Sequence, residues 1–112
     1  MNPSRGEIWL IDLNPVRGGE QAGQRPCLVT SVDLFNHGPA ELIIILPITS
    51  KKKNIPFHVT LKPPEGNINI ESYIKCEDIR SASRSRLIKR IGQASDETMG
   101  LVEDRLRILM DL

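Results

Sequence analysis

The chain has 112 residues, of which 39% are hydrophobic, so it can bury one core but not two. We therefore expect a single domain over residues 1–112. Lys and Arg number 15 against 14 Asp and Glu, and this net charge of +1 excludes the overall basic excess of many nucleic-acid binders. Any contact with nucleic acid would need a local basic patch.

The first predicted element is a strand at residues 7–13 (EIWLIDL), which is rich in bulky residues and is followed by the turn pair Asn14-Pro15. Charged residues within this stretch exclude the apolar centre of a secretory signal. No apolar run approaches the roughly 20 residues that cross a bilayer. We therefore expect a soluble, cytoplasmic protein without a membrane partner.

Residues 16–25 (VRGGEQAGQR) hold three glycines and almost no apolar side chains, which predicts a loop. It is long for a hairpin connection, and long ordered loops tend to be functional. Pro26 opens a second strand, residues 26–32, where its missing N–H is tolerated. Residues 33–39 carry turn-forming side chains.

The nearly continuous apolar run at residues 41–48 (ELIIILPI) predicts a strand buried on both faces, ending at the polar tract TSKKKN. Three further strands are predicted at residues 57–62, 72–79 and 86–92. From Ser95, a good N-cap, apolar residues recur at helical spacing up to Met110. Five to seven short strands followed by one helix predict a mainly antiparallel barrel or sandwich.

The two cysteines, Cys27 and Cys76, lie far apart, each in an apolar-rich strand pattern. Neither has a second cysteine or a histidine at metal-ligand spacing. We interpret both as reduced thiols in the core and predict no metal site and no cofactor.

Several segments occur in an order that resembles the MazF/PemK toxins along nearly the whole chain: RGEIWLIDLNP, GGEQAGQRPCLVTS, an apolar strand ending PITS, YIKCEDIRS and a C-terminal helix. The most specific piece is EQAGQRP, which sets turn glycines, a carboxylate, an arginine and a strand-starting proline at fixed spacing. The resemblance implies a mainly β fold, an SH3-like β-barrel of the MazF/PemK/CcdB type with a C-terminal helix. It also implies a homodimer, cleavage of single-stranded RNA and control by a cognate MazE-like antitoxin.

Carried over by motif, the family's catalytic arginine falls on Arg25 and its catalytic threonine on Thr49, while the loop carboxylate falls on Glu20. Gly19 stands where many relatives have serine, so any contact of that serine with RNA is lost. The residues expected to bind substrate are Gln21, Gln24, Ser50, Lys51, Lys52 and Glu77.

Metal-free RNA cleavage uses the 2′-hydroxyl of the substrate as nucleophile and leaves a 2′,3′-cyclic phosphate, so the 2′-proton must be removed and the phosphorane neutralised. Arg25 suits the second task because a guanidinium can donate to two phosphate oxygens at once. Its ordinary pKa, above about 12, makes it a poor base, and we assign Glu20 as the general base. Thr49 would position a phosphate oxygen.

Other polar residues have ordinary structural interpretations. We expect His58 and His37 to be exposed residues without a catalytic role. The lysines at 51–53 form either a solvated loop or a contact to the RNA backbone. The later basic stretch, Arg80 to Arg90, is typical of charge protection at a strand edge. Phe57 and Tyr73 could stack on bases, but core packing is the better interpretation.

Two alternatives remain open. A CcdB-like toxin shares the fold and poisons DNA gyrase through its C-terminal helix, and it has no need of Arg25 and Thr49 together. A catalytically inactive member would only bind antitoxin.

Overall fold

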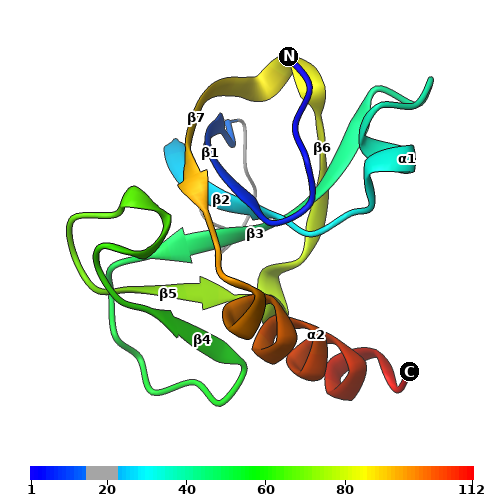
Figure 1. The fold of residues 1–112 in the computed structure, drawn as a ribbon. Coiled ribbons are helices and arrows are strands. Elements are labelled where there is room, and N and C mark those ends of the chain that lie inside the picture. Colours follow the sequence, from blue (N-terminus) through cyan, green and yellow to red (C-terminus); the bar gives the residue numbers. More distant parts are fainter. Residues whose placement is uncertain (15–22) are drawn as a thin grey trace.

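The computed structural model describes residues 1–14 and 23–112, and within them an antiparallel sheet is joined to a C-terminal helix (Figure 1). The mainly β fold with a C-terminal helix is therefore confirmed. The strands and helices are β1 (Glu7–Asp12), β2 (Gln24–Val29), α1 (Asp33–Asn36), β3 (Leu42–Thr49), β4 (His58–Leu61), β5 (Ser72–Lys75), β6 (Arg80–Ser83), β7 (Leu87–Gln93) and α2 (Asp96–Met110). Three 3₁₀ turns lie between them, η1 (Glu65–Asn67), η2 (Cys76–Asp78) and η3 (Arg84–Arg86).

The sheet runs in the order β4-β5-β3-β2-β1-β7, and β6 pairs with the first half of β3. The second half of β3 pairs with β5, so this long strand serves both parts of the sheet. Among the described strands, the outermost two, β4 and β7, do not pair, so the barrel stays open on that side.

The 3₁₀ turn η1 bridges this open side. The Asn67 side-chain amide donates to the Ile91 carbonyl of β7 at 3.0 Å, and the Ser95 N–H donates to a Glu65 carboxylate oxygen at 2.9 Å. Gly66 makes this approach possible, because its φ of 65° belongs to the left-handed region and a Cβ there would lie 2.4 Å from Ile8 Cδ1.

Buried side chains form two apolar clusters. One contains Ile8, Leu28 and Leu46 and extends to Met99 and Val102 of α2. The other is formed by residues on the opposite face of β1, β2 and β3, including Trp9, Val29 and Ile45, together with Ala82 of β6 and Leu87 of β7. The predicted burial of β3 on both faces is confirmed, because its residues supply both clusters.

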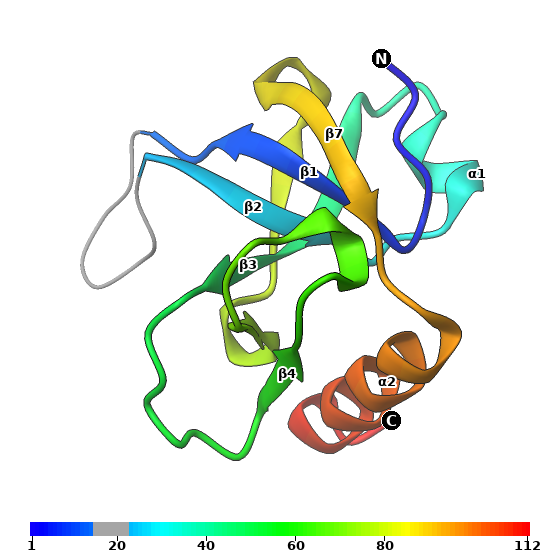
Figure 2. The same ribbon diagram turned by 60° about the vertical axis from the view of Figure 1, so that its left-hand side comes forward.

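The helix α2 begins where the sequence predicts. The Ser95 hydroxyl accepts from the Thr98 N–H at 3.1 Å, and Met99 and Val102 are buried against the sheet. Both views place the helix beside β4 (Figures 1 and 2). No helix in the described part of the chain is long and apolar enough to cross a membrane.

Several predicted elements are wrong in detail. The strand predicted at residues 26–32 spans Gln24–Val29, and β6 has no counterpart among the predicted strands. Residues 33–39 contain one turn of helix, α1, because the fully buried Asn36 amide donates to the Ser31 carbonyl at 2.8 Å and holds the chain coiled. The strand predicted at 72–79 ends at Lys75. There Asp78 lies 3.5 Å from both Lys75 and Arg80, so the chain turns through η2 before β6 begins.

Candidate active site

Arg25 and Thr49 lie at adjoining ends of two neighbouring antiparallel strands. The last residues that pair between β2 and β3 on this side are Cys27 and Pro47. Continued by two residues, the same register sets Arg25 opposite Thr49. Residues opposite each other in an antiparallel pair project from the same face of the sheet, so the continued register predicts that these two side chains lie close together.

The same row of residues continues across the sheet. Thr49 pairs with Tyr73 of β5, and Tyr73 pairs with Thr60 of β4. We call the surface that carries Arg25, Thr49, Tyr73 and Thr60 the open face. The residues that alternate with them are buried in the first apolar cluster: Ile48, Val59 and Ile74.

Thr49 is held firmly, with 8% of its surface exposed. Its hydroxyl oxygen accepts from the Lys51 N–H at 3.2 Å, a bond that begins the turn after β3. A hydroxyl has one donor and two acceptor positions, so this contact leaves its O–H able to donate to a phosphate oxygen. Arg25, in contrast, is exposed at the start of β2.

The other residues expected in the site border the open face or lie outside the described residues. Gln24 is exposed beside Arg25, and Ser50 is exposed beside Thr49. Gly23 has a φ of 75°, which fits its predicted role in shaping the loop. Glu20 and Gln21 fall outside the residues that the structure describes, so their roles stay predictions.

A polar pocket of about 250 Å³ lies next to Thr49's partner, Tyr73. The exposed side chain of Lys52 lines it from the segment after β3, which places one lysine of the predicted basic run beside the open face. The Tyr73 hydroxyl donates to Glu71 at 2.7 Å, and this bond raises the pKa of that hydroxyl. Tyr73 therefore keeps its proton at neutral pH. The full lining is Lys52, Asn54, Ile55, Pro56, His58, Thr60 and Tyr73.

The predicted exposure of His58 is wrong. Only 5% of its side chain is exposed, and its Nε2 lies 2.8 Å from the Glu77 carboxylate. Glu77 itself, predicted to bind substrate, lies on η2 with 29% of its side chain exposed. The alternation of FHVTLK marked His58 as a surface position. It gave no sign of a partner 19 residues away.

The later basic stretch makes structural contacts at several of its members. Arg84 donates to the Asn36 carbonyl at 3.1 Å, and Arg86 donates to the carbonyls of Asp12 and Asn14. Arg90 pairs with Glu7 at 2.9 Å. These bonds tie β7 and η3 to neighbouring segments, and charge protection of a strand edge stays a prediction.

Both cysteines are buried free thiols, as predicted. Burial raises the pKa of each thiol to about 12, so neither provides a thiolate nucleophile at neutral pH. Within residues 1–14 and 23–112, no group of three His, Cys, Asp or Glu side chains could hold a metal ion.

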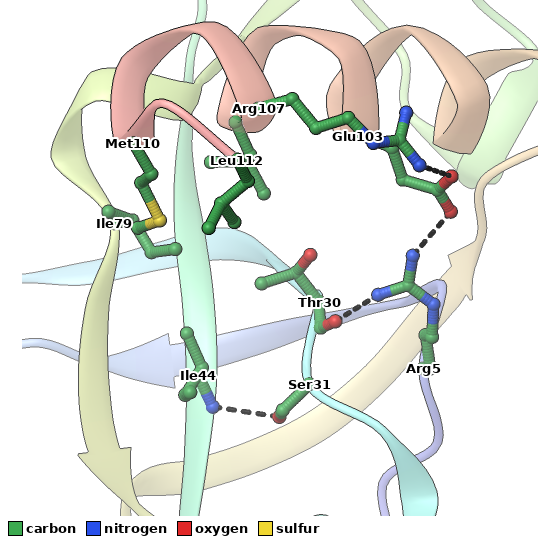
Figure 3. A pocket seen from close by; sticks show the side chains of 10 residues that line it. Arg5, Thr30, Ser31, Ile44, Ile79, Glu103, Arg107, Met110 and Leu112 are labelled. Carbon is green, nitrogen blue, oxygen red and sulfur yellow. Dashed lines mark hydrogen bonds and ion pairs between the residues drawn. The ribbon is translucent and has the colours of Figure 1, made fainter.

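A separate groove of about 340 Å³ lies beneath the end of α2 and contains none of the predicted site residues (Figure 3). Its floor is apolar, with Ile44 and Ile79 facing Met110. At its edge Arg5 donates to the Thr30 carbonyl and pairs with Glu103 of α2 at 2.6 Å. This groove is suited to an apolar contact, whereas the open face carries the polar side chains.

Comparison with known proteins identifies the chain's relatives. A family model described as "PemK-like, MazF-like toxin of type II toxin-antitoxin system" matches residues 4–110. The chain belongs to this family. It is 35% identical to endoribonuclease MazF9 of Mycobacterium tuberculosis over 113 aligned positions, which cover 96% of each protein.

Solved structures agree with the PemK/MazF assignment. MazF from Deinococcus radiodurans is 29% identical and superposes with a TM-score of 0.89, over 100% of this chain and 99% of that one. A MazE-MazF structure from the same organism is 28% identical, with a TM-score of 0.83 and the same coverage. The resemblance found in the sequence motifs is thus confirmed, and the open face lies on a PemK/MazF scaffold.

Proposed function

We propose that this PemK/MazF toxin is a metal-independent endoribonuclease that cleaves single-stranded RNA at preferred sequences in the cytoplasm. The observation that carries the proposal is the register of β2 and β3, in which Cys27 pairs with Pro47. Its continuation by two residues would set Arg25 opposite Thr49. A phosphate above this point could accept bonds from the guanidinium and from the Thr49 hydroxyl together. Phosphate is the charged group that every RNA cleavage must stabilise.

The proposed reaction is attack of the 2′-hydroxyl on the adjacent phosphorus, which closes a 2′,3′-cyclic phosphate and expels the 5′-oxygen. That oxygen takes a proton from solvent and leaves as a 5′-hydroxyl. Arg25 neutralises the charge that develops on the phosphorane oxygens. Thr49 holds one of those oxygens from a fixed strand end. Glu20 takes the 2′-proton in this scheme, since a carboxylate is a far better base than a guanidinium. DNA lacks the 2′-hydroxyl and would not be cut.

The basic loop supplies affinity that does not depend on sequence. The exposed residues Lys51, Lys52 and Lys53 directly follow the Thr49-Ser50 pair, where they could contact phosphates on either side of the cleaved bond. This local patch reconciles RNA binding with the net charge of +1. Gln21, Gln24, Ser50 and Glu77 would contact the RNA around it.

Purified protein incubated with a mixed single-stranded RNA in excess EDTA should cut it and leave 2′,3′-cyclic phosphate ends. Mapping both ends of each product by sequencing and mass spectrometry checks the result. Intact RNA together with inhibition of DNA gyrase would instead support the CcdB-like activity. Intact RNA without gyrase inhibition would indicate an inactive member.

We also infer that the protein forms a homodimer and binds a MazE-like antitoxin. The MazE-MazF structure from D. radiodurans supports the antitoxin as a partner. Large apolar side chains are exposed at the end of α2 beside the apolar groove, with exposed fractions of 60% for Ile108, 47% for Met110 and 84% for Leu112. Covering such a patch is a common basis of association.

Sedimentation equilibrium at micromolar concentration should give twice the chain mass of 12.6 kDa. Met110→Glu should shift the distribution toward the monomer, because it puts a charge into the apolar patch. Glu97→Gln, an exposed change at the other end of α2, serves as the control. A monomer at all accessible concentrations of the unaltered protein would exclude the dimer.

A further inference from the structure

The pair formed by His58 and Glu77 is the most distinctive polar contact of the described residues that the proposed chemistry does not use. His58 Nε2 and Glu77 Oε2 are 2.8 Å apart, and only 5% of the histidine side chain is exposed. A carboxylate only accepts hydrogen bonds, so the proton must lie on Nε2. The histidine is the donor that holds the carboxylate.

The neighbouring acidic residue has ion pairs of its own. The adjacent carboxylate, Asp78, lies 3.5 Å from the amino group of Lys75 and 3.5 Å from the guanidinium of Arg80. Asp78 thus pairs with cations from β5 and β6. Glu77 has a different partner, His58, which lies on β4.

The histidine is a costly choice for stability alone. Its other ring nitrogen, Nδ1, is buried and has no hydrogen-bond partner among the described residues. A buried polar atom without a partner is unfavourable, and an apolar side chain of similar size would avoid that cost. The benefit of His58 must therefore come from its bond to Glu77.

The position of the pair connects it to the open face. His58 is two residues from Thr60 on β4, so both side chains project on the same side of the sheet as Tyr73 and Thr49. His58 also lines the polar pocket of about 250 Å³ with Lys52 and Tyr73. That volume is below the roughly 300 Å³ of the smallest pockets for drug-sized ligands and suits a single base.

We propose that His58 is a positioning residue for base recognition. It fixes the Glu77 carboxylate so that the second oxygen, Oε1, accepts a hydrogen bond from the exocyclic amino group of an RNA base bound beside Thr49. Carboxylates recognise amino groups in this way, and cytosine, adenine and guanine carry one, whereas uracil does not. The inference rests on the proposed RNA cleavage and adds to it the class of base that is read.

The test measures base preference. After mapping where the unaltered protein cuts, four RNAs are compared at each position near the cut, differing only in one base. At one position the protein should cut RNA with an amino-bearing base at least about tenfold faster, by kcat/KM, than RNA with uracil, as expected for a hydrogen bond to a charged group. His58→Leu should reduce this ratio to within about threefold of one, with uracil RNA still cut.

Three comparisons separate positioning from a general effect on stability. His58→Gln keeps a donor near the place of Nε2 and should retain most of the preference. In the Glu77→Ala background, His58→Leu should have no further effect on the ratio, since His58 acts through Glu77. His37→Leu removes the other histidine, whose ring bonds the Pro3 carbonyl at 2.7 Å, and should leave the preference unchanged.

Uniformly slower cutting of all four RNAs by His58→Leu would overturn the inference while leaving the proposed function intact. If that variant does not fold, Glu77→Gln on the partly exposed carboxylate decides the matter, and an unchanged preference overturns the inference. Absence of RNA cleavage by the unaltered protein would overturn the proposed function, and the inference with it.

Discussion

Arg25→Ala should lower the rate of RNA cleavage by about a hundredfold to a thousandfold. This is the loss typical when one hydrogen-bond donor to a developing oxyanion is removed. The loss should be larger in kcat than in RNA affinity, because the charge that Arg25 neutralises grows toward the transition state. Single-turnover cleavage of a labelled oligonucleotide, with affinity measured separately, provides both values.

Protein stability should be almost unaffected by Arg25→Ala, because the side chain is exposed at the start of β2. Arg25→Lys should recover only a small part of the rate, since an ammonium cannot make the paired contact of a guanidinium. Lys89→Ala removes the same charge from exposed β7 and should cut RNA normally. Undiminished cleavage by Arg25→Ala would rule out the proposed mechanism.

Gly92→Ala should destabilise the protein by about 3 kcal/mol or more, the upper range for inserted atoms that cannot be accommodated. A Cβ at this position would lie 2.3 Å from the Gly66 carbonyl oxygen and 2.4 Å from its carbonyl carbon. Both are backbone atoms of η1, which cannot rotate aside as a side chain would. Urea unfolding followed by circular dichroism gives the change in free energy.

The matched control is Gly100→Ala on α2. Apart from its chain neighbours and the backbone of its own helix, no described atom lies within 4 Å of a Cβ built there, and the residue is exposed. Alanine should therefore stabilise the helix by roughly 0.5–1 kcal/mol. If Gly→Ala lowers the free energy of unfolding at Gly92 but raises it at Gly100, the close approach of Gly92 to η1 causes the loss of stability. A loss of under 1 kcal/mol at Gly92 would mean that η1 can move away from β7.

The sequence predicts much of this fold because its local signals agree with one another. The alternation of β4, the apolar run of β3 and the N-cap Ser95 each match the structure. The errors fall where distant side chains decide the local conformation. Asn36 coils α1 by bonding to Ser31, and Asp78 ends β5 by drawing Lys75 and Arg80 together.

The same distinction applies to the candidate site. Motif resemblance selects Arg25 and Thr49, which are 24 positions apart in the chain, and the register of β2 and β3, continued by two residues, predicts that they lie opposite each other. Alternation marks His58 as a surface residue, and the pairing of β4 with β5 then covers it with Glu77. Pairings between strands are long-range facts that no local pattern contains.

In the proposed mechanism, cleavage activity depends on the correct register between β2 and β3. A slip of one residue between these strands would turn Arg25 and Cys27 to the opposite side and leave the same strands without a catalytic centre. A partly folded chain with the correct secondary structure would therefore be harmless to RNA. Toxicity, in this view, begins only when the sheet has found its single correct alignment.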